Sequence, residues 1–352
     1  MREQGTTTVT VFKAPPCAQI VALGLVACAL APASAPAQEG KVTVETVEYK
    51  GWKNALKISN GDVELIATLD VGPRILSYKL AGGKNVLKEY EDQLGKSGES
   101  EWMIRGGHRL WTSPEDLTRT YAPDNAPVRN SQPEPGVIRL TPPPDERHGI
   151  QKEIDIKLAP RGCRVTLVHR IKNIGKAPTD LAPWALTVMA PGGLEIIPLP
   201  GKKPHPGAAS NAKGPEDFAP NQSIILWPFF DFKDTRWTFG TKYITLKQSR
   251  FQGATKLGLD HRMGWVGYLN GGTLFVKRFD RITGEAYPDR GTNFQTFTNE
   301  DMLEIESLGP AIRLGAGLAV EHVERWELHG GIGEVGTEAD ADAKVLPVVG
   351  PQ

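Results

Sequence analysis

Cysteine is scarce in this chain of 352 residues, which contains 3 cysteines. Two of them, Cys17 and Cys28, lie in the N-terminal leader described below, so Cys163 is the one thiol expected in the mature protein. This excludes a framework of intramolecular disulfides. No histidine or asparagine stands in a recognisable nucleophile motif with Cys163, and we expect it to be a structural thiol.

Net charge is lacking as well, because 41 basic residues balance 41 acidic ones. The sequence therefore offers no broad basic surface for nucleic acid or anionic lipid. Motifs of common chemistry are missing too: the chain has no His-Glu-x-x-His, no His-x-His, no calcium-loop spacing and no Gly-x-Ser-x-Gly. We predict no metal, no cofactor and no nucleic-acid partner.

No apolar run is long enough to span a membrane as a helix, which needs about 20 residues. The run Ala18–Leu30 instead resembles the core of a signal peptide, and the small residues ending at Ala37 form an A-x-A cleavage site. We predict that residues 1–37 are a signal peptide and that the mature protein is periplasmic or secreted. An alternative is a lipoprotein anchored through Cys28, because Leu25–Cys28 fits a lipoprotein box.

Glycine and proline, by contrast, are abundant, with 38 and 28 residues, and they interrupt the chain too often for long helices. Apolar and polar residues alternate in short segments such as Val63–Leu69, Arg74–Leu80 and Ile150–Leu158, which is typical of half-buried strands. So many apolar strands need antiparallel sheets packed face to face. The sequence therefore predicts an all-β sandwich over residues 38–332, followed by a flexible, solvated tail over 333–352.

The segment Arg105–Glu115 has the composition of a carbohydrate-binding site. After a glycine pair it contains His108, Arg109, Trp111 and Glu115. An indole ring stacks on the apolar face of a pyranose, while imidazole, guanidinium and carboxylate groups bond to its hydroxyls. We expect this segment to contact a mono- or oligosaccharide. The alternative is that the tryptophan belongs to the core and the charges to a solvated loop.

Other side chains are candidates for the same site. Arg74 enters a strand after Gly-Pro and is a candidate donor to hydroxyls. Glu304 and Glu306 lie on one face of a strand, because side chains repeat there with period two, and a partly buried carboxylate can act as a general base. Trp184 is either a core residue or a second stacking platform, and Asn293 offers hydrogen bonds near a predicted loop.

A further set of segments spans much of the mature chain: Gly72–Ile75, Gly106–Trp111, His169–Asn173, Ala182–Leu186, Lys256–Gly258 and Leu303–Pro310. Together they resemble an uncharacterised bacterial domain family of the galactose mutarotase-like superfamily. The resemblance covers nearly the whole mature chain and implies a supersandwich of antiparallel sheets whose concave face binds carbohydrate.

The resemblance also implies roles for individual residues. Arg74 is similar to the substrate-contacting arginine of aldose epimerases, His108 to their first histidine, and Glu306 to their catalytic base, with Glu304 as the adjacent alternative. Where those enzymes have a second histidine, the general acid for the ring oxygen, this chain has Trp184. An indole cannot donate a proton in that role, so the resemblance supports binding more than catalysis.

These observations lead to three hypotheses of function. The first is an exported, monomeric carbohydrate-binding protein with a mutarotase-like concave site. The second is a sugar epimerase, an isomerase of the aldose 1-epimerase type, or another carbohydrate-active enzyme, with Glu306 as base and His108 as acid or polarising group. The third is a structural envelope protein without a small ligand. The first two require Arg74, His108 and Glu306 to share one cleft.

Overall fold

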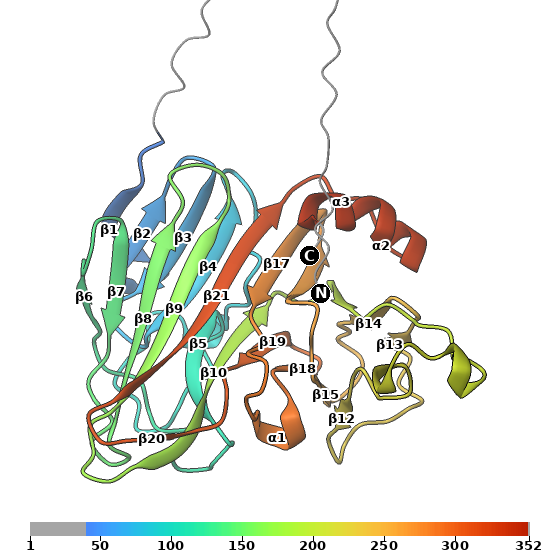
Figure 1. Ribbon diagram of the computed structural model, residues 1–352. Helices are drawn as coiled ribbons and strands as arrows, with labels where there is room; N and C mark the ends of the chain where they lie inside the picture. The colour runs from blue at the N-terminus through green and yellow to red at the C-terminus, as the bar shows by residue number, and fades with distance from the viewer. Residues whose placement is uncertain (1–39, 351–352) are drawn as a thin grey trace, which may run out of the picture. The chain divides into compact units, whose positions relative to one another are not determined.

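Two antiparallel β-sheets form the framework of residues 40–350, the part of the chain that this computed structural model describes (Figure 1). The first sheet has 11 strands. In spatial order they are β1 (Thr43–Tyr49), β2 (Trp52–Ser59), β3 (Val63–Thr68), β4 (Arg74–Leu80), β5 (His108–Ser113), β10 (Thr179–Met189), β19 (Leu303–Leu308), β18 (Phe294–Thr298), β15 (Thr255–Leu259) and β12 (Ile224–Leu226), with β20 (Ile312–Leu314) paired to β10.

The second sheet has 10 strands and packs against the first. In spatial order they are β13 (Trp237–Phe239), β14 (Tyr243–Lys247), β11 (Leu194–Pro198), β16 (Trp265–Asn270), β17 (Thr273–Phe279), β21 (Ala319–His329), β9 (Val165–Asn173), β8 (Ile150–Leu158), β7 (Val137–Thr141) and β6 (Arg129–Ser131).

The main hydrophobic core lies between the two sheets. In β9, for example, Val165, Leu167 and Ile171 are buried, and every second side chain of the strand faces inward. Neighbouring strands contribute Ile154 and Ile156 to the same core. The alternation seen in the sequence therefore reflects one buried and one more exposed face. The prediction of an all-β sandwich of antiparallel sheets is confirmed.

The C-terminal residues differ from the solvated tail expected from the sequence. Residues Glu338–Lys344 form helix α2 and Leu346–Val349 form helix α3. Thr337 begins α2 with a capping box in which its side chain accepts a hydrogen bond from the Asp340 amide. Val345 is fully buried in a second cluster on the outer face of the β11–β16–β17 region. Apolar residues spaced along the helices, hidden among charges in the sequence, thus hold this end to the sheet.

Three remaining short helices and a single-turn segment connect the strands. They are η1 (Glu91–Gln93), η2 (Ala209–Asn211), η3 (Pro215–Asp217) and α1 (Pro288–Gly291). Within residues 40–350, no helix is long and apolar enough to cross a membrane. The predicted signal peptide, with its cleavage site at Ala37 and the alternative anchor Cys28, lies outside the described residues.

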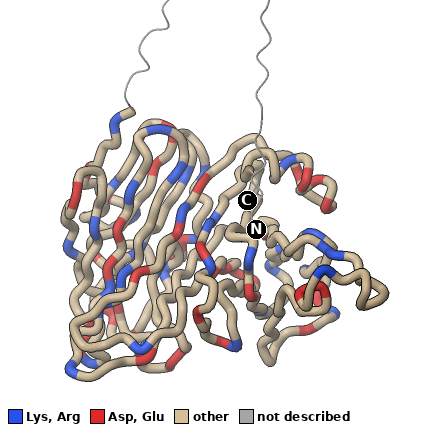
Figure 2. Tube along the Cα trace, in the orientation of Figure 1, with Lys and Arg blue, Asp and Glu red and all other residues tan. Residues whose placement is uncertain are grey.

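Basic and acidic residues are interspersed along the described chain (Figure 2). Many of them pair across neighbouring strands, as in the network that joins Arg139 and Arg170 to Glu153 and Asp155. Mixed signs of charge agree with the balanced composition.

Candidate functional site

Strand β5 occupies the middle of the first sheet, between β4 and β10. The chain enters it through Gly106 and Gly107, both at positive φ. A Cβ atom on Gly106 would lie 2.0 Å from the Lys88 carbonyl oxygen, and one on Gly107 would lie 2.3 Å from the Ile75 oxygen. Only glycine permits this close backbone approach. The glycine pair therefore sets the position of β5 rather than contacting a ligand.

Side chains of β5 alternate between the two faces of the sheet. Arg109 and Trp111 pair with Leu186 and Trp184 of β10 on the outer face, away from the second sheet. This face carries a cleft that encloses about 370 Å³. Lining residues come from six strands or their adjoining loops, and they include Trp102, Arg109, Trp111, Glu115, Tyr121, Trp184, Trp227, Lys256, Phe297 and Glu304.

Aromatic rings form one wall of the cleft. The centroids of Trp102 and Trp111 are 5.1 Å apart, and Trp111 lies 5.3 Å from Trp184. Tyr121 lies within 5.4 Å of Trp102 and 5.1 Å of Trp111. Trp102 and Tyr121 are only partly buried, so their faces are available to a ligand. Sugar rings stack on flat apolar surfaces of this kind.

Two ion pairs cross the floor of the cleft. Arg109 Nη2 donates to Glu304 Oε1 over 2.8 Å, and Lys256 Nζ lies 3.0 Å from Glu306 Oε2. Trp184 Nε1 also donates to Glu306 Oε2, over 2.8 Å. Burial raises the pKa of Glu306, while the neighbouring Lys256 opposes this effect. Each cation of the floor is therefore matched by a carboxylate.

Glu306 lies beneath the surface of the cleft. Its side chain is fully buried, and it is absent from the cleft lining, whereas Lys256 and Trp184 line the cleft and bond to it. The Lys256 ammonium lies 5.0 Å from the Trp184 ring and 4.9 Å from the Trp227 ring, which are distances typical of cation–π contacts. Lys256 therefore separates the Glu306 carboxylate from any ligand in the cleft.

Several donors of the cleft have no acceptor among the described residues. Arg109 Nε and Nη1 and Trp102 Nε1 are buried N–H groups without a hydrogen bond. Buried donors are normally satisfied, so these three covered atoms are exceptions to the usual pattern. At the rim, Tyr121 donates to Glu115, which leaves the other carboxylate oxygen of Glu115 as an acceptor. Donors and acceptors thus surround an aromatic wall.

Arg74 lies on the same face of the sheet but behind Trp102. Its guanidinium is 5.7 Å from the Trp102 ring, and Nη2 donates to the Met103 carbonyl and pairs with Asp124 at 3.0 Å. Burial lowers the pKa of Arg74 to about 10, against the attraction of Asp124. Arg74 does not line the cleft. From this position Arg74 can support Trp102, but it does not make the direct sugar contact that the sequence predicted.

Asn293 is also outside the cleft. Its Oδ1 accepts from the His261 amide over 2.6 Å, and its Nδ2 donates to the His261 carbonyl over 2.8 Å. This reciprocal pair ties the approach to β18 to the loop after β15. Both polar groups of the side chain are used, so Asn293 has a structural place instead of the ligand contact expected from the sequence.

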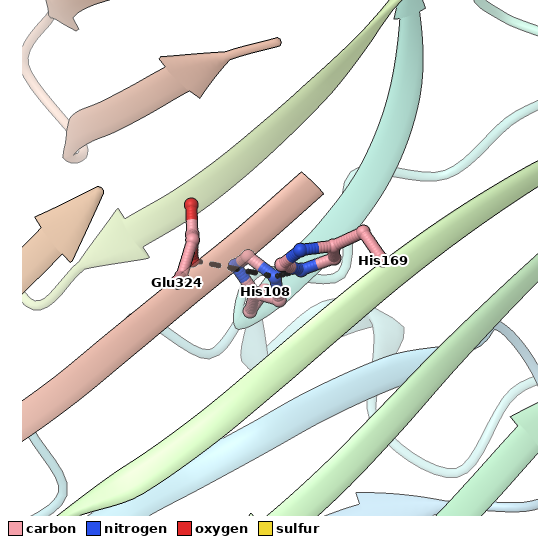
Figure 3. A group of neighbouring side chains, drawn as sticks. All are labelled: His108, His169 and Glu324. Atoms are coloured by element: carbon pink, nitrogen blue, oxygen red, sulfur yellow. Dashed lines mark hydrogen bonds and ion pairs between the residues drawn. The ribbon is translucent and has the colours of Figure 1, made fainter. Parts of the chain in front are cut away.

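His108 differs most from its expected position. It pairs with Thr187 and lies on the inner face of the sheet, between the two sheets, where it is fully buried (Figure 3). Glu306 lies on the opposite face of the same sheet. The expected arrangement, with imidazole and carboxylate facing each other across one cleft, is therefore not present. Adjacent residues of a strand point to opposite faces, and the cleft receives Arg109 instead.

Around His108, the inner face carries a buried polar cluster. His108 Nε2 lies 2.7 Å from His169 Nε2, and His169 Nδ1 lies 3.0 Å from the His322 carbonyl oxygen. A carbonyl only accepts, so we infer that His169 carries its proton on Nδ1 and accepts at Nε2 from His108. Thr187 Oγ1 then donates to His108 Nδ1 over 2.9 Å. Burial lowers the pKa of His108 and of His169, and both are neutral.

A lysine completes this cluster. Lys277 Nζ lies 2.7 Å from Glu324 Oε1 and also donates to the carbonyls of Ala185 and Ile305. Trp326 Nε1 donates to the second oxygen of Glu324 over 2.9 Å. The three protons of the Lys277 ammonium thus have three acceptors. The attraction of Lys277 and neighbouring groups holds the pKa of Glu324 well below its usual range despite its burial.

The same cluster has the donor types of a metal site. Of the described residues, only His108, His169 and Glu324 bring three such donor atoms together, within 4.8 Å of one another. In this structure, however, the two imidazoles bond to each other and Glu324 is neutralised by Lys277. A divalent ion there would add a second buried cation next to that ammonium, which is unfavourable in a dry interior. We interpret the cluster as a polar link between the two sheets.

Comparisons with known proteins place the fold. Neither a family model nor a curated protein matches the sequence. Among solved structures, a galactose mutarotase-like protein from Lactobacillus casei superposes with a TM-score of 0.51 at 9% identity, covering 78% of this chain and 100% of that one. The chain has the galactose mutarotase-like fold. The recognition made from the sequence is therefore confirmed at the level of fold.

Two further solved structures superpose on this chain. A candidate aldose 1-epimerase from Klebsiella pneumoniae gives a TM-score of 0.52 at 11% identity, covering 86% of this chain and 85% of that one. A TPR-domain containing protein from Parabacteroides distasonis gives 0.52 at 16% identity and covers 81% of this chain. The chain spans about half of that longer protein, 49% of its length.

Within the mutarotase-like fold, the cleft brings together Arg109, Trp111, Trp184, Glu115 and Glu304 from the set expected by sequence. Glu306 lies under its floor, and the other three expected residues lie elsewhere. The structure adds Lys256, which sequence reasoning had not assigned to the site although its segment carried the family resemblance. A lone lysine in a strand gives no signal of its own, because its carboxylate partner is 50 residues away.

Proposed function

We propose that this protein is an exported, monomeric carbohydrate-binding protein and that the cleft on the outer face of the first sheet holds the sugar. In this proposal Trp102 or Tyr121, whose rings are partly exposed, stacks on the apolar face of a pyranose, while Trp111 lies behind them under the Arg109 guanidinium. Arg109 donates to ring hydroxyls through its two free N–H groups, and Glu115 accepts from them. The likeness to mutarotase-like structures supports the fold that presents such a face, while the cleft itself supports the ligand.

One observation carries the proposal: buried donors without acceptors lie directly beside an aromatic wall, in a cleft of about 370 Å³. This volume falls within the range of small-molecule sites. Both cations of the floor already have carboxylate partners, so the floor has no surplus positive charge to attract an anionic ligand. A neutral polyhydroxylated molecule, which both donates and accepts, fits this arrangement.

The position of Glu306 favours binding over epimerisation. Anomer interconversion needs a base at the C1 hydroxyl and an acid at the ring oxygen. Glu306 is covered by Lys256 and Trp184, and His108 is on the other face of the sheet. No acid and base pair therefore faces the cleft in the positions that the sequence resemblance implied. Arg74, His108 and Glu306 do not share one cleft, so the expected basis of the sugar site is wrong, and the proposed binding relies on Arg109, Trp102 and Tyr121 instead.

The experiment is a glycan array followed by calorimetric titration of the best sugar. We expect saturable binding that Trp102→Ala weakens about fivefold or more, because stacking of a sugar ring on one indole contributes on the order of 1 kcal/mol. Trp102 is partly exposed, so its removal leaves the core intact. Phe251→Ala is the matched control, since Phe251 is 95% exposed and lies outside the cleft.

Polarimetry on fresh α-glucose and α-galactose separates binding from catalysis. We expect mutarotation at the buffer rate. Acceleration that depends on Glu306 would favour the epimerase hypothesis instead. Absence of any sugar ligand on the array, with a correctly folded protein, would contradict the proposed function.

A further inference from the structure

A second cavity lies on the other side of one loop from the sugar cleft. It also encloses about 370 Å³. The loop that follows β5 separates the two: its residues Glu115 and Tyr121 line the cleft, while Thr118 and Asp124 line the second cavity. The remaining wall comes from the β3–β4 turn and from the β7–β8 connection. This cavity is independent of the proposed sugar site.

A lysine points into the second cavity from an inward position of β8. Lys152 pairs with Ile171 of β9, and its neighbours two residues away, Ile150 and Ile154, are buried in the core. Period two therefore places the Lys152 side chain on the inner face of the sheet. Such a position normally holds an apolar residue. Lys152 is partly exposed, so its ammonium is open to a ligand in the cavity.

No counter-ion for Lys152 is found among the described residues. Its ammonium has neither a carboxylate oxygen within 4.0 Å nor a hydrogen bond within 3.5 Å. Asp124 and Asp145 are near enough to attract it, but each has another partner: Asp124 pairs with Arg74 at 3.0 Å, and Asp145 binds His148 Nδ1 at 2.7 Å. Burial accordingly lowers the pKa of Lys152.

The walls beside Lys152 are largely apolar. Prolines dominate them, in the run Pro142–Pro144 and at Pro73 and Pro123, and Leu110 and Ile150 form the inner end. The two nearest carboxylates are engaged with other groups, so three ammonium protons face the cavity without an acceptor. Glu146 and Arg147 also line the cavity; both are exposed and their charges are opposite. A pocket with an apolar inner end and a lysine without a counter-ion recognises an apolar body that ends in one negative charge.

We propose that this cavity, which we name the Lys152 pocket, binds a small organic anion with an apolar body, such as a medium-chain monocarboxylate. The carboxylate pairs with the Lys152 ammonium, and the hydrocarbon part lies along the prolines. The ligand carboxylate accepts the hydrogen bonds of the Lys152 ammonium, which has no acceptor among the described residues. Inorganic phosphate, which carries charge without an apolar body, binds more weakly.

Titration of the full chain with butanoate, hexanoate, octanoate and neutral hexanamide tests the proposal by calorimetry or ligand-observed NMR. We expect one site, affinity that rises about fourfold for each added CH₂ group, and hexanamide at least tenfold weaker than hexanoate. Lys152→Met removes the preference for hexanoate over hexanamide, and Lys152→Arg retains it. Lys157→Met is the control, because Lys157 lies on the same strand with an exposed side chain.

The proposal would be overturned by no saturable binding of any carboxylate, by equal affinity for hexanoate and hexanamide, or by hexanoate affinity unchanged in Lys152→Met. If phosphate binds more tightly than hexanoate, the claim that the pocket recognises an apolar body is wrong. If Lys152→Met fails to fold, the wild-type protein can test the site instead. Its lysines are acylated with and without hexanoate, and peptide mass spectrometry measures the acylation of each lysine. We expect hexanoate to protect Lys152 and not Lys157, and lack of protection would refute the site. None of these outcomes depends on sugar binding.

Discussion

Acid is predicted to unfold this protein through histidines that folding keeps neutral. Burial lowers the pKa of His322 from 6.5 to about 3 and that of His261 from 6.5 to about 4. Between the folded and unfolded values, the unfolded chain binds protons that the folded protein does not bind. Stability is therefore fully present above pH 6.5 and is lost as pH falls toward the folded values.

The size of the effect follows from those values. At pH 4, each of these two histidines accounts for a loss of about 3 kcal/mol in the free energy of unfolding. His108 and His169 act in the same direction, because burial lowers their pKa as well. Glu324 adds to the loss below about pH 4.5, since its depressed pKa favours the ionised form in the folded state. Losses of this size approach the whole stability of a typical domain.

Urea unfolding followed by tryptophan fluorescence measures the effect from pH 7.5 to pH 4. In His322→Gln an amide replaces the ring N–H that donates to Ser307. The slope of the free energy of unfolding against pH should then fall by about 1.4 kcal/mol per pH unit. His205→Gln is the control, because His205 is exposed and should leave the slope unchanged. A free energy of unfolding that is constant between pH 7 and pH 4.5 would refute the reasoning.

Three other predictions concern single sites. Gly107→Ala should lower the free energy of unfolding by more than about 2 kcal/mol in a urea titration, because the new Cβ would lie 2.3 Å from the Ile75 oxygen at a φ of +66°; an unchanged midpoint would contradict the close approach. Val345→Ala should cost about 2 kcal/mol by the same assay, because Val345 is fully buried between α3 and the sheet, whereas a solvated tail would tolerate it. Glu304→Gln should weaken sugar binding several-fold in calorimetry by loosening Arg109, with Glu300→Gln as the exposed control, and equal affinities of the two variants would exclude this positioning role.

The sequence predicted the fold for a local reason. Alternation within segments such as Ile150–Leu158, and the glycines and prolines between them, record which face of each strand is buried. The same argument placed Glu304 and Glu306 on one face of β19, and they do share it. The helices α2 and α3 were not predicted from the sequence, because their few buried residues, such as Ala341 and Val345, lie among acidic residues.

The candidate site was predictable only in part. The segment Arg105–Glu115 indicated polar and aromatic contacts, but a strand divides such a segment between two faces: Arg109 and Trp111 line the cleft, while His108 lies between the sheets. Which face is which depends on where the second sheet packs. Lys256 could not be assigned because its importance comes from Glu306 and two tryptophans, all distant in the chain.

By itself, the sequence determined the strands, their two-sided character and the presence of residues able to bind a sugar, because these depend on side-chain types and on a period of two. Only the tertiary structure decided that Lys256 covers Glu306, that His108 joins a buried polar cluster and that Lys152 faces a cavity without a counter-ion. These outcomes arise because strands far apart in the chain pair with one another. The burial of a residue, its bonding partner and its pKa depend on this tertiary environment and not on the residue type alone.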